Sequence, residues 1–403
     1  MNNAFRLYLG AQILTTLAST MLSVAVGWHI YAATGNPFDL ALVGAMQILP
    51  IAGLFIVSGW VIDSVQRKLI LVACAVLQGI VLLGLALSLA SPEFSRLTVF
   101  GLLFINGIAR AFQMPARQSV LPGIVTDAYL SQAVAISSTV WTAGATAGPF
   151  VAGLIIAWID TGIYWLLAAF TFVAAWMCVL LPTLVVRRPV GRGLAQLLEG
   201  VRYVWRNPLV LPAISLDLII VFAGSVVALL PVYAIDILQV GPEALGLMRA
   251  MPAAGAMIAG VILTRMPDMR PAGTLLFAAL AMFAVSIIVF AFSGNLWLSL
   301  VALFVYGATD MVSVNVRMSI IQLATPDSLR GRVNSVNSLF IATSNDAGDF
   351  RAGAVATVLG PVTTVMLGGV MAAVVTVGGF ILAPTLRRLQ RVTDARHDAE
   401  SSA

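Results

Sequence analysis

The chain has 403 residues, of which 60% are apolar and only 10% charged, and its formal net charge is +5. A soluble fold of this size could not cover its surface with so few charges, since ordinary soluble domains carry roughly 25% charged residues. The composition excludes a cytosolic enzyme and a disordered chain, and it indicates a membrane protein. No nucleic-acid partner is expected, because a basic binding face would need a soluble domain that this chain lacks.

Apolar runs of membrane-spanning length account for nearly the whole chain. Six lie at about 5–33, 39–62, 68–90, 97–116, 132–159 and 162–186, and six more at about 209–238, 243–264, 272–293, 295–323, 333–358 and 362–385. The first run has no A-x-A cleavage site and is too long for a signal peptide, so it reads as a transmembrane helix. We therefore predict an all-α membrane protein with twelve transmembrane helices, joined by short turns such as Gly360-Pro361.

One longer polar segment, 187–208, separates the two sets of six. Its apolar residues recur at helical spacing, which predicts an amphipathic helix on the membrane surface; they are Leu194, Leu197, Leu198, Val201 and Val204. The expected organisation is an N-terminal six-helix bundle over 1–186, a cytoplasmic linker over 187–208, a C-terminal six-helix bundle over 209–386 and a cytoplasmic tail over 387–403.

The basic residues gather on one side of the predicted topology. Of the 22 Lys and Arg, 16 fall on the side that holds both termini: Arg6, Arg67, Lys68, Arg187, Arg188, Arg192, Arg202, Arg206, Arg265, Arg270, Arg330, Arg332, Arg387, Arg388, Arg391 and Arg396. The opposite side holds only Arg96. The positive-inside rule therefore places both termini in the cytoplasm, and a bacterial inner membrane is the expected location.

The two sets of six spans are related by an internal repeat. A shift of 200 residues superimposes many identical residues, among them Gly107 on Gly307, Arg117 on Arg317, Gly148 on Gly348 and Gly153 on Gly353. Earlier in the chain the shift is 202, which places Pro50 on Pro252. Transporters are commonly built from such repeats, so two homologous bundles of the same orientation are predicted.

Two motifs stand at the ends and crossings of these spans. The second span ends in a charged turn made of Gly59, Asp63, Arg67 and Lys68, and the fifth carries Gly144, Gly148, Pro149 and Gly153. With the twelve-span repeat and the segment 326–333 (Pro-Asp-Ser-Leu-Arg-Gly-Arg-Val), they resemble the major facilitator superfamily and, within it, the enterobactin-exporter-like branch. Ser64 and Gln66 depart from the family's pattern. The resemblance implies a secondary transporter whose helices 1, 4, 7 and 10 line a central cavity.

Each motif has two readings. Asp63 could pair with an arginine or a helix N-terminus and lock the cytoplasmic side, or the charges could merely stabilise a turn at the headgroups. We favour gating, because the position aligned with Asp63 in the second half is Arg265, so the acidic residue occurs in one half alone. The glycines of the fifth span let helices pack closely, and Pro149 could add a bend.

Ionisable residues inside the bilayer are functional candidates because they are costly to keep there. Asp310 and Arg317 lie on one face of the tenth span, and Arg110 and Arg117 on the equivalent face of the fourth. Our hypothesis is that Asp310 takes up the coupling proton while Arg110, Arg117 or Arg317 holds it ionised until substrate competes. The alternatives are a fixed ion pair and, for Arg117, snorkelling to the headgroups.

Further candidates are less specific. Asp217, in the seventh span, is a second proton candidate, and Asp346 and Asp349 form either a proton site or an interhelical salt bridge. Arg249, the counterpart of Gln47, could bind an anionic substrate or snorkel. His29 in the first span could titrate or accept a hydrogen bond, although it is more simply a polar residue near the outer end.

The function predicted is proton-coupled efflux of a small amphipathic molecule such as a siderophore or drug, with a proton-coupled or facilitative importer as the alternative. No Gly-x-x-x-x-Gly-Lys loop occurs, so ATP is not expected to drive transport. A membrane-embedded enzyme is disfavoured because the sequence has only two histidines and no H-E-x-x-H motif, and a non-transporting receptor is a remote reading. The expected partners are substrate, protons and lipid for a monomer. No cofactor or metal is expected, since Cys74 and Cys178 lie in separate apolar runs.

Overall fold

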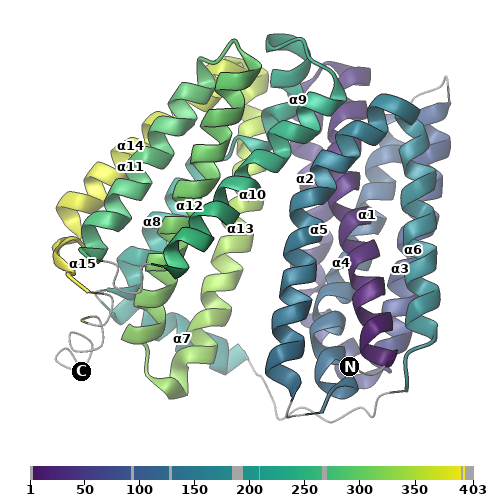
Figure 1. Ribbon diagram of the computed structural model, residues 1–403, viewed down its shortest axis with the longest axis horizontal. Coiled ribbons are helices and arrows are strands. Elements are labelled where there is room, and N and C mark those ends of the chain that lie inside the picture. The colour runs from purple at the N-terminus through teal and green to yellow at the C-terminus, as the bar shows by residue number, and fades with distance from the viewer. Residues whose placement is uncertain are drawn as a thin grey trace. The chain divides into compact units, whose positions relative to one another are not determined.

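The computed structural model describes residues 3–91, 95–126, 129–183, 194–207, 209–265, 270–391 and 394. Inside the helices, the side chains at 55, 56, 59, 60, 63, 194–198, 327, 328, 335, 339 and 342 lie outside the described set, so Gly59 and Asp63 of the gating motif are not described as a site. The described residues are almost entirely helical and contain no strand, which confirms the all-α expectation (Figure 1).

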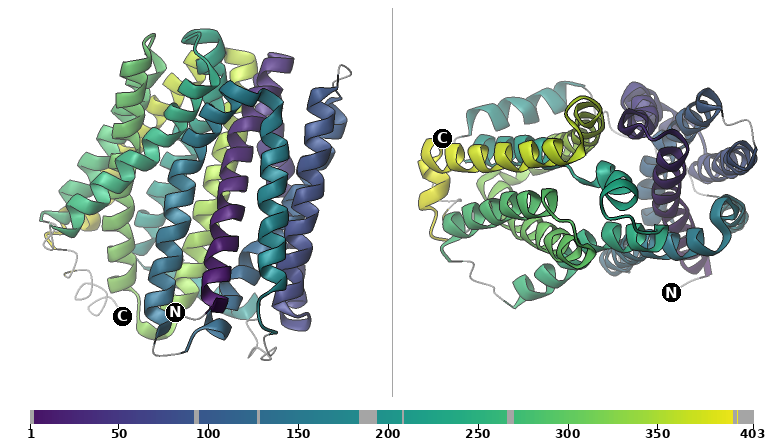
Figure 2. Two further views of the ribbon diagram at one scale, coloured as in Figure 1. Left: turned by 45° about the vertical axis from the view of Figure 1, so that its right-hand side comes forward. Right: turned by 90° about the horizontal axis from the view of Figure 1, so that it is seen from above.

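Six long helices form the first half of the chain. They are α1 (Asn3–Thr34), α2 (Pro37–Ser64), α3 (Arg67–Ala90), α4 (Arg96–Ile124), α5 (Leu130–Ile159) and α6 (Ile163–Val179). Helix α1 packs against α5 and α6, α3 against α4 and α6, and α2 against α4, and Figure 2 shows them running alongside one another. Their bounds lie close to the predicted spans because hydrophobic length and turn residues determine both.

The turns between helices are formed by residues that the sequence indicated as turn residues. The Asn36 side chain accepts a hydrogen bond from the backbone N–H of Phe38, and Pro37 occupies the first turn of α2. Asn295 caps α12 in the same way, through the N–H of Trp297. Gly35 and Gly360 adopt positive φ of 61° and 81°, which only glycine adopts at little cost.

The polar segment contains α7 (Leu194–Arg206), a helix fastened to the helices that follow it. The Tyr203 hydroxyl donates to the carbonyl of Ala324 at 2.5 Å, and Arg332 Nη1 lies 2.5 Å from Glu199 Oε2. Burial raises the pKa of Tyr203 despite its hydrogen bonds with Asn207 and Thr325, so the hydroxyl remains a donor. Helix α7 therefore packs on protein along one side as well as exposing Trp205.

The second half contains α8 (Val210–Gly224), α10 (Pro242–Thr264), α11 (Ala272–Ala291), α12 (Leu296–Ala324), α13 (Asp327–Leu359), α14 (Pro361–Leu382) and the short α15 (Pro384–Arg388). Helices α11, α12 and α14 pack side by side, and α8 contacts α12, α13 and α14. Ten stretches of the described residues are long and apolar enough to cross a membrane; one of them, Leu130–Val179, contains both α5 and α6.

The seventh span differs from the sequence expectation of one continuous helix over 209–238. Helix α8 ends at Gly224, two non-helical residues follow, and the chain continues as a 3₁₀ turn (Val227–Leu229), the short α9 (Leu230–Val232) and a π turn (Tyr233–Ile237). Gly224 disfavours helix, Pro231 lacks the N–H that would bond to the preceding turn, and Arg351 of α13 contacts the last carbonyls of α8. A discontinuous span of this kind marks binding sites in many transporters.

The described residues divide into two compact units. The first comprises 1–190 with 234–250, and the second comprises 191–233 with 251–403. The segment 234–250 therefore packs with the first six helices, although the repeat groups it with the last six. Within the first unit, a buried cluster around Phe5, Tyr8, Ile70 and Val120 joins α1, α3 and α4.

Candidate transport site

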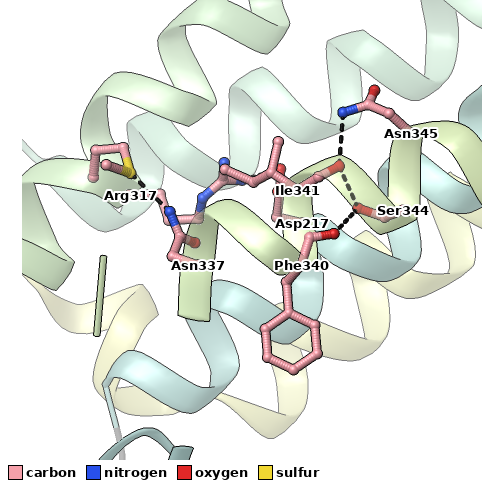
Figure 3. Close-up of polar contacts among 8 residues, drawn as sticks. Asp217, Arg317, Asn337, Phe340, Ile341, Ser344 and Asn345 are labelled. Atoms are coloured by element: carbon pink, nitrogen blue, oxygen red, sulfur yellow. Dashed lines mark hydrogen bonds and ion pairs between the residues drawn. The ribbon is translucent and has the colours of Figure 1, made fainter. Parts of the chain in front are cut away.

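The second unit buries an ion pair between two helices. Asp217 of α8 and Arg317 of α12 form a salt bridge, and their side chains are only 8% and 2% exposed (Figure 3). The sequence placed each residue among the candidates but did not pair them. Arg317 is the largest fully buried side chain of the described chain, and such a charge is tolerated inside a protein only when it is paired.

Asp310 completes this group. It lies on α12 within electrostatic range of both Asp217 and Arg317, and we call Asp217, Asp310 and Arg317 the charged cluster. Two carboxylates and one guanidinium sum to a charge of −1, so the cluster is neutral only when it holds one proton. In a medium of low dielectric constant, that arithmetic makes the cluster a chemically suitable site for proton uptake.

The direct partner of Arg317 is one that the sequence did not predict. The hypothesis from the sequence named Arg317, with Arg110 and Arg117, as an arginine that could hold Asp310, which lies seven residues earlier on the same helix. Seven residues correspond to about 10 Å along a helix axis, whereas Asp217 approaches from the neighbouring helix. The ion pair therefore joins α8 to α12, and Asp310 acts on it through space.

Helix α13 lines the neighbourhood with polar side chains. Asn337, 2% exposed, donates to the sulfur of Met318 at 3.1 Å, while Ser344 and Asn345 donate to carbonyls of their own helix at 2.7 and 2.9 Å (Figure 3). These residues satisfy their own hydrogen bonds and add no charge.

A second polar group holds the break in the seventh span. The Ser225 hydroxyl donates to Asp349 of α13, and Arg351 donates to the carbonyls of Phe222 at 3.1 Å and Ala223 at 2.7 Å. The last carbonyls of a helix have no partner within it, and an arginine there also complements the negative end of the helix dipole. Arg351 thus caps α8. In the sequence, only the pair Gly224-Ser225 could have indicated that a helix ends here.

Asp349 therefore accepts a hydrogen bond from the residue that follows α8, and it lies within electrostatic range of Arg351. Asp346 is half-buried on the same helix, α13. Asp346 and Asp349 are three residues apart on α13. The hydrogen bond from Ser225 goes to Asp349.

The equivalent region of the first unit combines glutamine amides with arginines. Gln78 and Gln113 exchange hydrogen bonds at 2.9 and 3.3 Å, and Arg110 Nη1 donates to Gln47 Oε1 at 2.9 Å. Arg117 is half-buried, and its carbonyl accepts from the Tyr8 hydroxyl at 3.4 Å. Arg110 is the repeat counterpart of Asp310, so the two halves place different chemistry at equivalent positions.

Two more candidate residues make polar contacts within the first unit. Arg249 donates to the hydroxyl of Ser23 on α1. His29, 8% exposed, lies 3.0 Å from both the Tyr164 hydroxyl and an Asp160 carboxylate oxygen. His29 therefore ties α1 to the turn between α5 and α6, and its polar partners explain its burial.

The motif residues make close or polar contacts. A Cβ at Gly144 would come within 3.0 Å of Ile13, and one at Gly148 would lie 2.0 Å from the Thr20 hydroxyl, so both glycines face α1. The backbones of Gly153 on α5 and Gly246 on α10 also lie close to each other. Pro149 lies inside α5. At the start of α3, Arg67 donates to the Ser119 carbonyl at 2.9 Å and Lys68 to that of Leu181 at 2.6 Å.

The model of the Major Facilitator Superfamily matches residues 8–345 of this chain. The chain belongs to this superfamily. It is therefore a transporter of the membrane rather than an enzyme, and its substrate is a small molecule. The resemblance drawn from the motifs and the repeat is confirmed at this level.

Curated relatives and solved structures agree with this assignment. The chain is 27% identical to the enterobactin exporter EntS of Escherichia coli O1:K1, over 96% of this chain and 94% of the relative, and 26% identical to the EntS of Shigella boydii serotype 4 over the same shares. The nucleoside transporter NupG superimposes with a TM-score of 0.72 at 12% identity, covering 96% of this chain and 98% of NupG. A bacterial homologue of the lysosomal transporter Spinster superimposes with a TM-score of 0.72 at 15% identity, covering 99% and 97%. At such identities these structures establish the fold alone.

Proposed function

We propose that this protein exports a small amphipathic molecule, such as a siderophore or drug, in exchange for protons by alternating access. The observation that carries the proposal is the charged cluster, in which two carboxylates share one guanidinium inside the membrane-spanning part of the second unit. The enterobactin exporters to which the chain is similar support efflux as the direction.

In this mechanism Asp310 takes up the proton. Arg317 remains bound to Asp217 and acts on Asp310 electrostatically, so protonation of Asp310 changes the cluster from a charge of −1 to neutral. A neutral cluster costs less to enclose away from water than a charged one. Proton binding therefore favours a closed site, and proton release on the cytoplasmic side favours an open one that can take substrate.

The remaining polar residues have supporting roles in the proposal. The Gln78–Gln113 amide pair and the Gln47 amide offer uncharged donors and acceptors for an amphipathic substrate. Asp63 with Arg67 and Lys68 provides the cytoplasmic gate. This assignment is supported by the charged motif and by the contacts of the two basic residues with carbonyls beyond α3.

The protein acts as a monomer in a bacterial inner membrane, with both termini in the cytoplasm and with residues 1–186 and 209–386 working as the N- and C-terminal bundles. The asymmetry of basic residues supports this orientation. A periplasm-dependent alkaline phosphatase fused after residue 391 should be inactive, and a fluorescent protein fused there should be bright. The reverse result would overturn the orientation.

The transport experiment uses everted membrane vesicles with an acidic interior, tested with a catecholate siderophore and an amphipathic fluorescent dye. Wild-type protein should accumulate at least one of them, and a protonophore should abolish accumulation. Asp310→Asn should lose gradient-driven accumulation and keep exchange of labelled for unlabelled substrate. Glu243→Gln is the matched control, since Glu243 is an exposed carboxylate in the first turn of α10. Undiminished proton-driven transport by the Asp310 variant would overturn the proton role, and substrate uptake with the gradient reversed would indicate an importer.

A further inference from the structure

A groove of about 330 Å³ lies between α11 and α14 on the second unit. Its lining residues are Thr274, Phe277, Ala278 and Ala281 from α11 and Thr376, Val377 and Phe380 from α14. Figure 1 shows α11 and α14 alongside one another, with α15 at one end of the pair. Nothing in the transport mechanism uses this groove.

The groove has a physical origin in residue size. On α11 the groove is lined by small exposed residues, Thr274, Ala278 and Ala281. Phe277 packs edge-on against Phe380 with ring centroids 5.4 Å apart, which closes the bottom of the groove with aromatic surface. A long apolar slot on a membrane helix pair fits a hydrocarbon chain, which can fill it with dispersion contacts.

Basic side chains stand at one end of this groove. The Arg387 guanidinium lies over the Phe380 ring, 4.8 Å from its centroid, and donates to the Phe380 carbonyl at 3.3 Å. Arg388, the next residue, is exposed. The backbone N–H of Gly273 donates to the carbonyl of Leu389 at 2.9 Å, so the tail that carries these arginines is fixed to the start of α11.

The charge at this end is therefore strongly positive. Arg391 follows on the same tail, and Arg270 lies two residues before the start of α11. Among the described residues of the tail, the one carboxylate is Asp394, which accepts from the N–H of Arg391 at 2.9 Å. An aromatic-floored apolar slot that ends in guanidinium groups matches a lipid with an anionic headgroup, because the guanidinium fork fits phosphate oxygens and the slot fits the acyl chain.

We propose that the groove between α11 and α14 binds an anionic phospholipid, with one acyl chain along Ala278, Ala281 and Val377 and the phosphate against Arg387 and Arg388. The site is independent of the proton mechanism. It would recognise the headgroup by charge, so a zwitterionic lipid of the same chain length occupies it less well.

The test measures lipid directly on the purified full-length protein. The protein is extracted in mild detergent, incubated with mixed micelles of phosphatidylglycerol or phosphatidylcholine, purified again, and its bound lipid is quantified by mass spectrometry. Wild-type protein should retain phosphatidylglycerol selectively. Arg387→Gln with Arg388→Gln should weaken its binding by about 30-fold, taking each basic residue as worth about fivefold, and Ala278→Trp should exclude it by filling the slot.

Two matched controls separate this site from general effects of charge and lipid exposure. Arg202→Gln with Arg206→Gln removes two exposed arginines from α7, and Val301→Trp adds the same bulk at a position of α12 that is 60% exposed. Both should bind phosphatidylglycerol as wild-type protein does. The proposal is overturned if the two lipids bind equally, if the control variants lose as much as the groove variants, or if the groove variants lose nothing. A dimer that Ala278→Trp dissociates would instead assign the groove to a second copy of the chain.

Discussion

Removing Arg317 from the charged cluster should destabilise the protein in a way that depends on pH. In the variant Arg317→Gln, Asp217 stays buried without its partner, and breaking a buried ion pair by removing one member typically costs about 3–5 kcal/mol. The exposures of the two side chains, 2% and 8%, place this pair among buried ones rather than surface ones. Because every 1.4 kcal/mol is tenfold, the folded population relative to the unfolded should fall by about 100- to 5,000-fold.

In this variant the carboxylate of Asp217 can lower the free-energy cost of its burial by taking up a proton. For a carboxyl group with an ordinary pKa of about 3.9, protonation costs about 4 kcal/mol at pH 7 and about 1.5 kcal/mol at pH 5. The folded variant then binds a proton that the unfolded chain does not bind, so its stability rises as the pH falls. The deficit of Arg317→Gln should therefore shrink by up to about 2.7 kcal/mol between pH 7 and pH 5.

The assay is thermal unfolding of the detergent-solubilised protein, followed by the rate of inactivation because unfolding of such proteins is often irreversible. At pH 7 the apparent Tm of Arg317→Gln should fall by on the order of 6–20 °C, taking about 2–4 °C per kcal/mol for a unit of this size. The double variant Asp217→Asn with Arg317→Gln is the control, because it removes both charges and should recover much of the loss without the same dependence on pH. A variant as stable as wild type, or an equal deficit at both pH values, would refute the argument.

Three further variants test other contacts. Arg351→Met should leave the last carbonyls of α8 without a donor and destabilise the protein by about 1.5–3 kcal/mol in thermal unfolding. A loss no larger than that of an exposed substitution such as Arg202→Met would contradict the capping role. Gly148→Val should overpack the α1–α5 contact by about 1–3 kcal/mol, which a similar Tm for this variant and wild type would disprove. His29→Phe should leave the buried Tyr164 hydroxyl without its partner and cost about 1–3 kcal/mol; unchanged unfolding would show that the hydroxyl finds another acceptor.

Helix positions followed from the sequence because each span must satisfy all its backbone hydrogen bonds inside the bilayer. The turn residues Asn36 and Gly360 marked where those helices begin and end, and the structure uses them in that way. The superfamily also followed from sequence, since the repeat and the motifs are properties of residue order. The break at Gly224 and Ser225 was missed because an apolar run conceals a local interruption whose cause lies partly in α13.

The choice of partners was decided by the tertiary structure. Helical spacing placed Asp310 and Arg317 on one helix and so suggested that they interact, but only the packing of α8 against α12 brings Asp217 to Arg317. The same holds for Arg351, whose capped carbonyls lie about 130 residues earlier in the chain. The low charge content determined by itself that the protein lives in a membrane and that each buried charge needs a partner. Which charge meets which depends on contacts distant in sequence, and residue spacing along a single helix carries no information about them.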